Sequence, residues 1–228
     1  MAKVLFGMMA VDMRNKLGGQ VFSKNRGGAY IRTKVTPTNP QTVAQQGARY
    51  NLTEFAQTWR TLTAAQRASW EAAVSNYQKT DIFGQLKSPS GINLYCKLNI
   101  NLAEIGVAPI TTPPTPGSLS EVTGVTLTAS HTANVFTIAW TSGAVPAGEN
   151  WIIRATKGLS AGRNFFKGFY RVIDTLPPAA TSPELESAAY VAKFGNIVAG
   201  QKYAVEIIQV NNVTGQKGQP ITAFAIAT

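Results

Sequence analysis

The chain has 228 residues, enough for one large or two small domains, and its 44% hydrophobic and 9% aromatic content excludes disorder throughout. The formal net charge of +10 is concentrated at the start: residues 1–49 carry eight Lys or Arg and one acidic residue (8 − 1 = +7), against +1 for 50–118 and +2 for 119–228. The single cysteine, Cys96, excludes an intramolecular disulfide and a multi-cysteine metal site, and no apolar run approaches the ~20 residues of a membrane span.

Residues 1–39 predict an extended basic arm that contains a hairpin. Two short strand-like runs, 20–24 and 29–35, flank the turn-forming segment that ends in Gly27-Gly28. In the second run Tyr30, Arg32 and Lys34 alternate with β-branched residues. A strand of period two would therefore have one charged face and one apolar face.

Residues 40–106 predict a small three-helix segment. Asn39-Pro40 is typical of an N-cap and first helical residue, and Thr63-Ala-Ala-Gln66 is a capping-box pattern that starts a second helix. Ser90 can cap a third helix that ends at Gly106. The apolar stripe of the first helix has helical spacing and consists of Ala48, Leu52, Phe55, Trp59 and Leu62.

Four prolines within residues 107–118 indicate a semi-rigid, extended linker. Residues 119–228 then contain strand-like runs with no helical pattern between them, which predicts a seven-stranded β-sandwich. The whole chain is thus expected to be an α+β multidomain protein. The seven runs are 122–129, 134–140, 151–156, 165–173, 188–193, 203–210 and 221–227.

Two of these runs resemble the second and sixth strands of a fibronectin type III domain. They are Phe136-Thr-Ile-Ala-Trp140 and Gly200-Gln-Lys-Tyr203-Ala-Val-Glu-Ile-Ile-Gln-Val-Asn211. In that family a tryptophan of the second strand packs in the core and a tyrosine anchors the start of the sixth, and Trp140 and Tyr203 match these positions. The resemblance implies an immunoglobulin-like sandwich over residues 119–228, with longer loops at Gly158 to Arg163 and at Pro177-Pro178.

The N-terminal half is similar to small virion proteins of tailed bacteriophages. The similarity rests on the basic Gly-rich hairpin and on Thr38-Asn-Pro40-Gln-Thr, Gln45-Gln-Gly-Ala-Arg49, Trp59-Arg-Thr-Leu-Thr63 and Gln66-Arg-Ala-Ser-Trp70. It implies a structural protein of the virion: a capsid auxiliary or decoration protein, or a head-to-tail connector or tail component. Major capsid protein or connector subunits, and copies of the chain itself, would be its partners.

The residues that usually perform catalysis are scarce. His131 is the only histidine and falls in a predicted turn, so a catalytic triad and a histidine-based metal site lack their parts. Cys96 lies beside the apolar stripe of the third helix, as a buried, inert thiol would. Asp174, Glu184 and Glu186 are too few for a calcium site. We therefore expect no enzymatic activity, no cofactor and no metal site.

The candidate partner-binding residues lie in the basic arm, and three interpretations of them remain open. The arm could add a strand to a neighbouring subunit and pair its cations with carboxylates there. It could instead bind nucleic acid through phosphate contacts and base stacking, or be an edge strand whose charges prevent aggregation. Protein docking is favoured because the folded segments are close to neutral. The residues concerned are Phe22, Lys24, Arg26, Tyr30, Arg32 and Lys34.

Two further sets of aromatic residues are candidates for binding. Phe55, Trp59 and Trp70 have the spacing of core residues, but they could form a helical docking surface because three short helices bury little by themselves. Trp151 and Phe165-Phe166 leave weak sugar binding by the sandwich open. Neither the sequence nor its charge favours a membrane partner.

Overall fold

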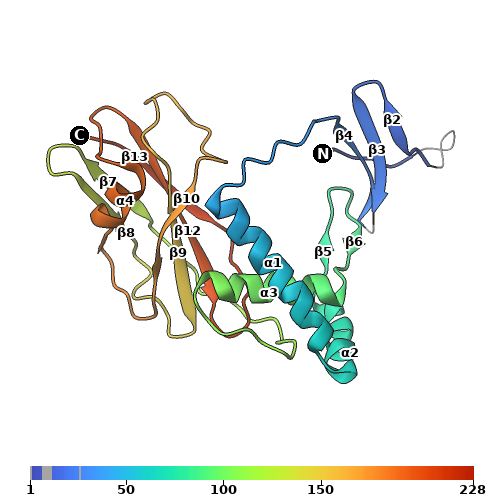
Figure 1. The fold of residues 1–228 in the computed structure, drawn as a ribbon. Helices are drawn as coiled ribbons and strands as arrows, with labels where there is room; N and C mark the ends of the chain where they lie inside the picture. The colour runs from blue at the N-terminus through green and yellow to red at the C-terminus, as the bar shows by residue number, and fades with distance from the viewer. Residues whose placement is uncertain (1, 7–11, 26) are drawn as a thin grey trace. The chain divides into compact units, whose positions relative to one another are not determined.

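A computed structural model describes residues 2–6, 12–25 and 27–228 (Figure 1). Within these residues the chain is α+β, with four α-helices and several antiparallel sheets. It divides into two compact units, which we call the N-terminal unit (residues 1–49 and 78–87) and the main unit (residues 50–77 and 88–228).

The N-terminal unit consists of a four-stranded antiparallel sheet and a separate two-stranded hairpin. The sheet has the strand order β1-β4-β3-β2, so the predicted hairpin is its centre and two short strands extend its edges. The described residues of the predicted arm thus include the four strands of this sheet. The strands are β1 (Ala2–Lys3), β2 (Asn15–Leu17), β3 (Gln20–Asn25), β4 (Gly28–Thr33), β5 (Lys79–Thr80) and β6 (Leu86–Lys87).

Helices α2 and α3 begin at the capping residues that the sequence indicates, whereas α1 begins at Val43 and not at the predicted Asn39-Pro40; there the Thr42 hydroxyl accepts a hydrogen bond from the Gln45 amide. Thr63 and Gln66 form a reciprocal capping box at the start of α2, and the Ser90 hydroxyl accepts a hydrogen bond from the backbone of Asn93 at the start of α3. Gly106, with φ of +73°, follows Ile105, the C-cap residue of α3, and a residue with a Cβ would be strained there. The helices are α1 (Val43–Thr61), α2 (Ala64–Ala73), a 3-10 turn (Val74–Tyr77) and α3 (Gly91–Glu104).

Tyr95 of α3 is the centre of the helical core. Its ring lies 5.3 Å from that of Trp70 and 5.5 Å from that of Trp59, and Phe55 meets it edge-on at 6.4 Å. Such tilted aromatic pairs add to the free energy gained by burying the rings. One side chain of α3 therefore joins α1 and α2.

Residues 107–118 form neither helix nor strand, but several of their backbone groups are hydrogen-bonded to the helices. Asn99 accepts a hydrogen bond from the amide of Ile110 at 2.7 Å and donates one to the Ile110 carbonyl at 3.2 Å. The Trp70 indole donates to the carbonyl of Thr111, and the Tyr77 hydroxyl donates to that of Pro114. The proline-rich segment is consequently fixed along the helical core.

Helix α3 also contacts the sandwich directly. Ile105 packs against a small buried cluster of Ile152, Ile208 and Val210, and the Asn101 amide donates to the carbonyl of Gly215 at 2.7 Å. A Cβ at Gly215 would collide with the carbonyl oxygen of Leu98, so glycine permits this close approach. Helices and sandwich thereby form one continuous unit.

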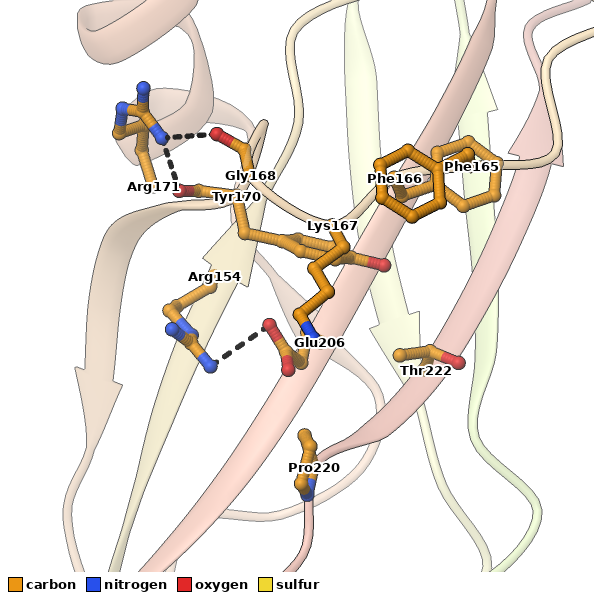
Figure 2. A pocket seen from close by; sticks show the side chains of 10 residues that line it. All are labelled: Arg154, Phe165, Phe166, Lys167, Gly168, Tyr170, Arg171, Glu206, Pro220 and Thr222. Carbon is orange, nitrogen blue, oxygen red and sulfur yellow. Dashed lines mark hydrogen bonds and ion pairs between the residues drawn. The ribbon is translucent and has the colours of Figure 1, made fainter. Parts of the chain in front are cut away.

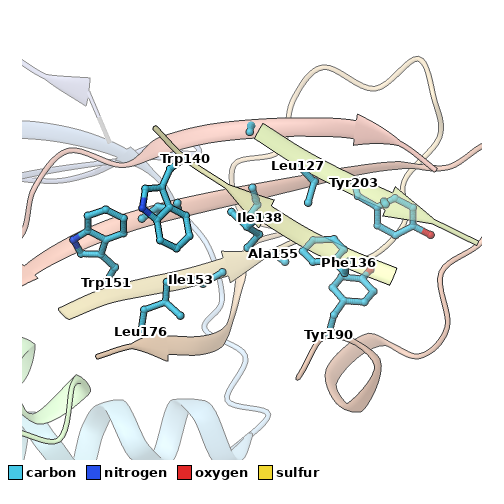
Figure 3. Close-up of a cluster of buried hydrophobic side chains, with 14 of the residues drawn as sticks. Leu127, Phe136, Ile138, Trp140, Trp151, Ile153, Ala155, Leu176, Tyr190 and Tyr203 are labelled. Carbon is cyan, nitrogen blue, oxygen red and sulfur yellow. The ribbon is translucent and has the colours of Figure 1, made fainter. Parts of the chain in front are cut away.

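The sandwich consists of a four-stranded antiparallel sheet, in the order β10-β9-β12-β13, and a three-stranded sheet, in the order β11-β8-β7. Both sheets contribute side chains to one buried cluster (Figure 3), in which Trp140 and Trp151 meet edge-on at 5.3 Å. The strands are β7 (Thr126–Ser130), β8 (Val135–Ala139), β9 (Glu149–Ala155), β10 (Arg171–Leu176), β11 (Glu184–Leu185), β12 (Lys202–Asn211) and β13 (Ile221–Ile226).

Two of the predicted strands differ in the structure. Residues 188–193 belong to helix α4 (Ser187–Phe194), where the alanines favour a helix and Tyr190 stacks on Phe136 at 4.3 Å. The strand expected over 165–173 begins only at Arg171, and the residues before it form a loop. Short apolar runs do not separate helix from strand by their period alone, which explains the first error.

Glu186, directly before α4, is an ionisable group buried in the sandwich. The residue is 3% exposed, and its Oε1 has no hydrogen-bond partner among the described residues. Burial, together with the negative charges of Asp174 and Glu184, raises the pKa of this carboxyl from 4.5 to about 7. Between about pH 4.5 and pH 7, the Glu186 carboxyl therefore keeps its proton in the folded chain and loses it in the unfolded chain.

We predict that this proton makes the free energy of unfolding fall as pH rises from about 4.5 to about 7, after which this contribution stays constant. Glu186→Gln should abolish that fall and stabilise the protein at pH 8 by up to about 3 kcal/mol, with little effect at pH 4. Urea unfolding across this pH range measures the difference. Glu121→Gln, at an exposed position, is the control. Parallel pH profiles for wild type and Glu186→Gln would contradict the assignment.

Candidate functional site

The two faces of the N-terminal sheet differ in chemistry. Residues paired across neighbouring strands lie on the same face, and the register places Ala2, Ile31 and Phe22 in one row. With Leu17 and Ala29, these residues are the apolar members of what we call the apolar face, which also carries the polar residues Asn15, Gln20, Lys24 and Thr33. The opposite, cationic face carries the rows Lys3, Tyr30, Ser23 and Arg32, Val21, Lys16.

The predicted arm residues are divided between these faces. Tyr30 and Arg32 lie on the cationic face, whereas Phe22 and Lys24 lie on the apolar one, because Lys24 pairs with Ala29. Lys34 directly follows β4, and its amide donates a hydrogen bond to the carbonyl of Gly19. Arg26 lies outside the described residues. The six residues therefore do not form one surface.

Two cations of this face were not among the predicted site residues. Lys3 is brought beside Tyr30 by β1, and Lys16 is brought onto the row of Arg32 by β2 and β3. Strands of two and three residues are too short to have a readable alternation. The high net positive charge of residues 1–49 was the one feature of the sequence that pointed to Lys3 and Lys16.

An ion pair joins the sheet to the β5–β6 hairpin. Lys3 Nζ lies 3.1 Å from Asp81 Oδ2, and the other carboxylate oxygen accepts hydrogen bonds from the amides of Phe83 and Gln85. Burial alone would raise the pKa of Asp81, but the two amide donors and Lys3 outweigh it, so the pKa lies below its ordinary value. A polar contact thus connects the hairpin to the sheet.

The described residues of the N-terminal unit include no buried hydrophobic residue. Several large apolar side chains of this unit are instead exposed to solvent by more than half, namely Leu5, Leu17, Val35, Val43, Ile82 and Leu86. A small sheet normally needs an apolar face packed against a second layer for independent stability. Within this unit the described residues do not supply that layer.

The three aromatic residues considered as a helical docking surface are buried or half-buried in the helical core. Trp70 is fully buried and Phe55 is 4% exposed, both against Tyr95, and Trp59 is half-buried beside them. They complete the chain's own core, which corrects that interpretation. On α1 the exposed large side chains are Val43, Tyr50 and Leu52, of which Leu52 had the spacing of a core residue.

The remaining candidates are His131 and Cys96, the single histidine and the single cysteine of the sequence. His131 is exposed in the turn after β7, where its backbone amide donates to the carbonyl of Thr228. Cys96 is buried, and burial raises the pKa of its thiol. Among the described residues, no three His, Cys, Asp or Glu side chains are grouped so that they could hold a metal ion. In the same part of the chain, no helix has the length and hydropathy to cross a membrane.

Comparison with known proteins gives little further information. No family model matches the chain, and no curated protein does. Among solved structures, an Fn3-like protein from Clostridium thermocellum is similar over 49% of this chain and 96% of its own length, at 17% sequence identity and a TM-score of 0.33. A likeness at that level carries no argument about function.

We predict that Cys96 reacts with an aromatic disulfide reagent at least about 100-fold more slowly in the folded chain than in urea, because its burial and raised pKa both suppress the exposed thiolate. Absorbance of the released thiolate measures the rate. The matched control is Ser75→Cys in a Cys96→Ser background, which places a thiol at an exposed position. If Cys96 and the thiol introduced at position 75 react at equal rates in the folded chain, Cys96 is not a buried, unreactive thiol.

Proposed function

We propose that the chain is a non-enzymatic structural protein that joins a protein assembly through its N-terminal unit. The observation that carries the proposal is the unfinished packing of this unit: its described residues bury no hydrophobic residue and leave several large ones in solvent. We infer that these exposed side chains contribute to a protein interface. A partner that covers them would supply the missing second layer.

The apolar face provides the free energy of docking. Fully burying a Leu, Ile or Phe side chain contributes about 1.5–3 kcal/mol, and the sheet offers on one side Leu17, which is 66% exposed, and the partly exposed Phe22 and Ile31, which would contribute less. The edge strands β1 and β2 are short, so addition of a strand from a partner would extend the ladder as well. Apolar burial would therefore give affinity, and backbone pairing would give direction.

The cationic face provides selectivity for the partner. Lys16 and Arg32 lie on it, and acidic side chains of a partner would pair with these two cations and fix the register, whereas Lys3 is already paired with Asp81. Binding of nucleic acid would use the same cations but would leave the apolar face in solvent. Protein docking accounts for both faces, which is why we place nucleic acid second.

For the main unit we propose an immunoglobulin-like sandwich of the fibronectin type III kind. Its support is the separation of the strands into the β11-β8-β7 and β10-β9-β12-β13 sheets, with Trp140 buried between them. Tyr203, at the start of β12, accepts a hydrogen bond from the amide of Val198 at 2.8 Å and donates one to its carbonyl. Such a tyrosine corner is a feature of these domains. The sandwich would project from the assembly or bridge neighbours.

The setting that we propose is the virion of a tailed bacteriophage, with the chain as a capsid auxiliary or decoration protein. The resemblance of residues 20–70 to small virion proteins supports this setting, and the exposed sheet faces suit attachment to a lattice. Major capsid protein and copies of the chain would be the partners. A head-to-tail connector or tail component is the alternative, in which connector subunits replace the capsid protein.

We predict that mass spectrometry detects the chain in purified particles of the phage that encodes it, and that deletion of residues 1–39 abolishes its incorporation. Phe22→Ser with Ile31→Ser should lower incorporation roughly tenfold or more, because it removes two apolar side chains from the docking face. Unchanged thermal unfolding of the main unit would establish that this unit remains folded in these variants.

The second test distinguishes protein docking from nucleic-acid binding. Lys16→Gln with Arg32→Gln should weaken incorporation in a salt-dependent way, while labelled DNA should bind the wild-type chain only weakly. Absence of the chain from particles would contradict the proposal. So would tight DNA binding with a steep salt dependence that is lost in Lys16→Gln with Arg32→Gln.

A further inference from the structure

A pocket of about 600 Å³ lies on the outer face of the four-stranded sheet of the sandwich (Figure 2). Its floor is a row of side chains from three adjacent strands: Arg154 of β9, Glu206 of β12 and Thr222 of β13 are direct cross-strand partners. The loop before β10 supplies the aromatic wall, with Phe165, Phe166 and Tyr170. The volume falls within the range of about 300–1,000 Å³ that is usual for small-molecule sites.

The charged pair in the floor is fixed before any ligand binds. Arg154 Nη2 lies 3.0 Å from Glu206 Oε2, and the Glu206 side chain is 9% exposed. Burial raises the pKa of the neighbouring Tyr170 hydroxyl, and the charge of Glu206 raises it further. Tyr170 therefore stays protonated and can act as a hydrogen-bond donor at neutral pH.

The loop that forms the wall is held at both ends. Arg171 donates hydrogen bonds to the carbonyls of Gly168 and Tyr170, at 3.0 and 2.7 Å (Figure 2). Lys202 donates to Asn164 and lies over the rings of Phe166 and Phe224. The aromatic wall is thus attached to the sheet rather than free to collapse onto the floor.

The lining matches one ligand chemistry better than others. Guanidinium, carboxylate and hydroxyl groups side by side suit a ligand whose polar groups both donate and accept, as sugar hydroxyls do. Phe165, which lines the pocket and is 64% exposed, offers an aromatic ring against which the C–H face of a pyranose can pack. The lining carries three cations, Arg154, Lys167 and Arg171, against one anion, Glu206, which favours a ligand with a negative charge.

We propose that this pocket binds an acidic saccharide, with a uronate ring packed on Phe165, its hydroxyl groups on the Arg154–Glu206 pair and its carboxylate toward Lys167. An apolar ligand would leave the charged pair without polar contacts, and a simple inorganic anion would not use the aromatic wall. The inference goes beyond the proposed assembly role. It involves the main unit alone and does not depend on the N-terminal sheet.

Titration of the isotope-labelled full chain with trigalacturonate, followed by amide NMR, tests the proposal. We expect shifts of the amides of residues 165–171 and of Glu206 and Thr222, with a Kd on the order of 1 mM or tighter for a ligand of this size. The neutral maltotriose should bind at least about fivefold more weakly, because it lacks the carboxylates. Acetate, which has a carboxylate and no pyranose ring, should shift none of these amides below about 20 mM.

Two pairs of variants locate the binding. Phe165→Ala and Lys167→Gln should each raise the Kd about fivefold or more, because one removes the stacking ring and the other the cation. Leu185→Ala, at a side chain that is also 64% exposed, and Lys193→Gln, at an exposed lysine of α4, should leave it unchanged. Absence of shifts with trigalacturonate, equal binding of maltotriose or acetate, or insensitivity to Phe165→Ala would each overturn the proposal.

Discussion

An apolar core forms only where the apolar face of one layer packs against apolar side chains of a second layer. The described residues of the N-terminal unit provide the first of these layers and not the second. Its strands satisfy one another's backbone groups, and Lys3 with Asp81 attaches the second hairpin, but no hydrophobic residue is buried among the described residues of this unit. Hydrogen bonds and one ion pair give only marginal net stability in water. The proposed docking role follows from this constraint.

The main unit differs because the inner faces of its two sheets pack against each other and its helices pack against one another. The two sheets enclose Phe136, Ile138 and Trp151, and the helices enclose Tyr95. Buried asparagines, Asn99 and Asn101, connect the helices to the proline-rich segment and to the sandwich through their amide groups. The main unit also holds the proposed saccharide pocket, on the outside of its four-stranded sheet.

Features set by local chemistry could be predicted from the sequence, whereas features set by pairing at a distance could not. The caps at Thr63 and Ser90 and the β3–β4 hairpin depend on neighbouring residues, and the structure contains them. The position of Lys3 on the cationic face depends on the pairing of β1 with β4. The pocket floor likewise requires the register of three strands, so nothing in the sequence placed Arg154 beside Glu206. Helix α4 was missed because its six-residue run has no decisive period.

Native-state hydrogen exchange of the isolated, monomeric chain tests the central claim most directly, since it reports the stability of each strand separately. The account predicts that the amides of β3 and β4 exchange with little protection while those of β9 and β12 exchange only on global unfolding, and that protection of β3 and β4 appears in the assembled state. Strong protection of β3 and β4 in the monomer would contradict it, because the sheet would then be stable without a partner.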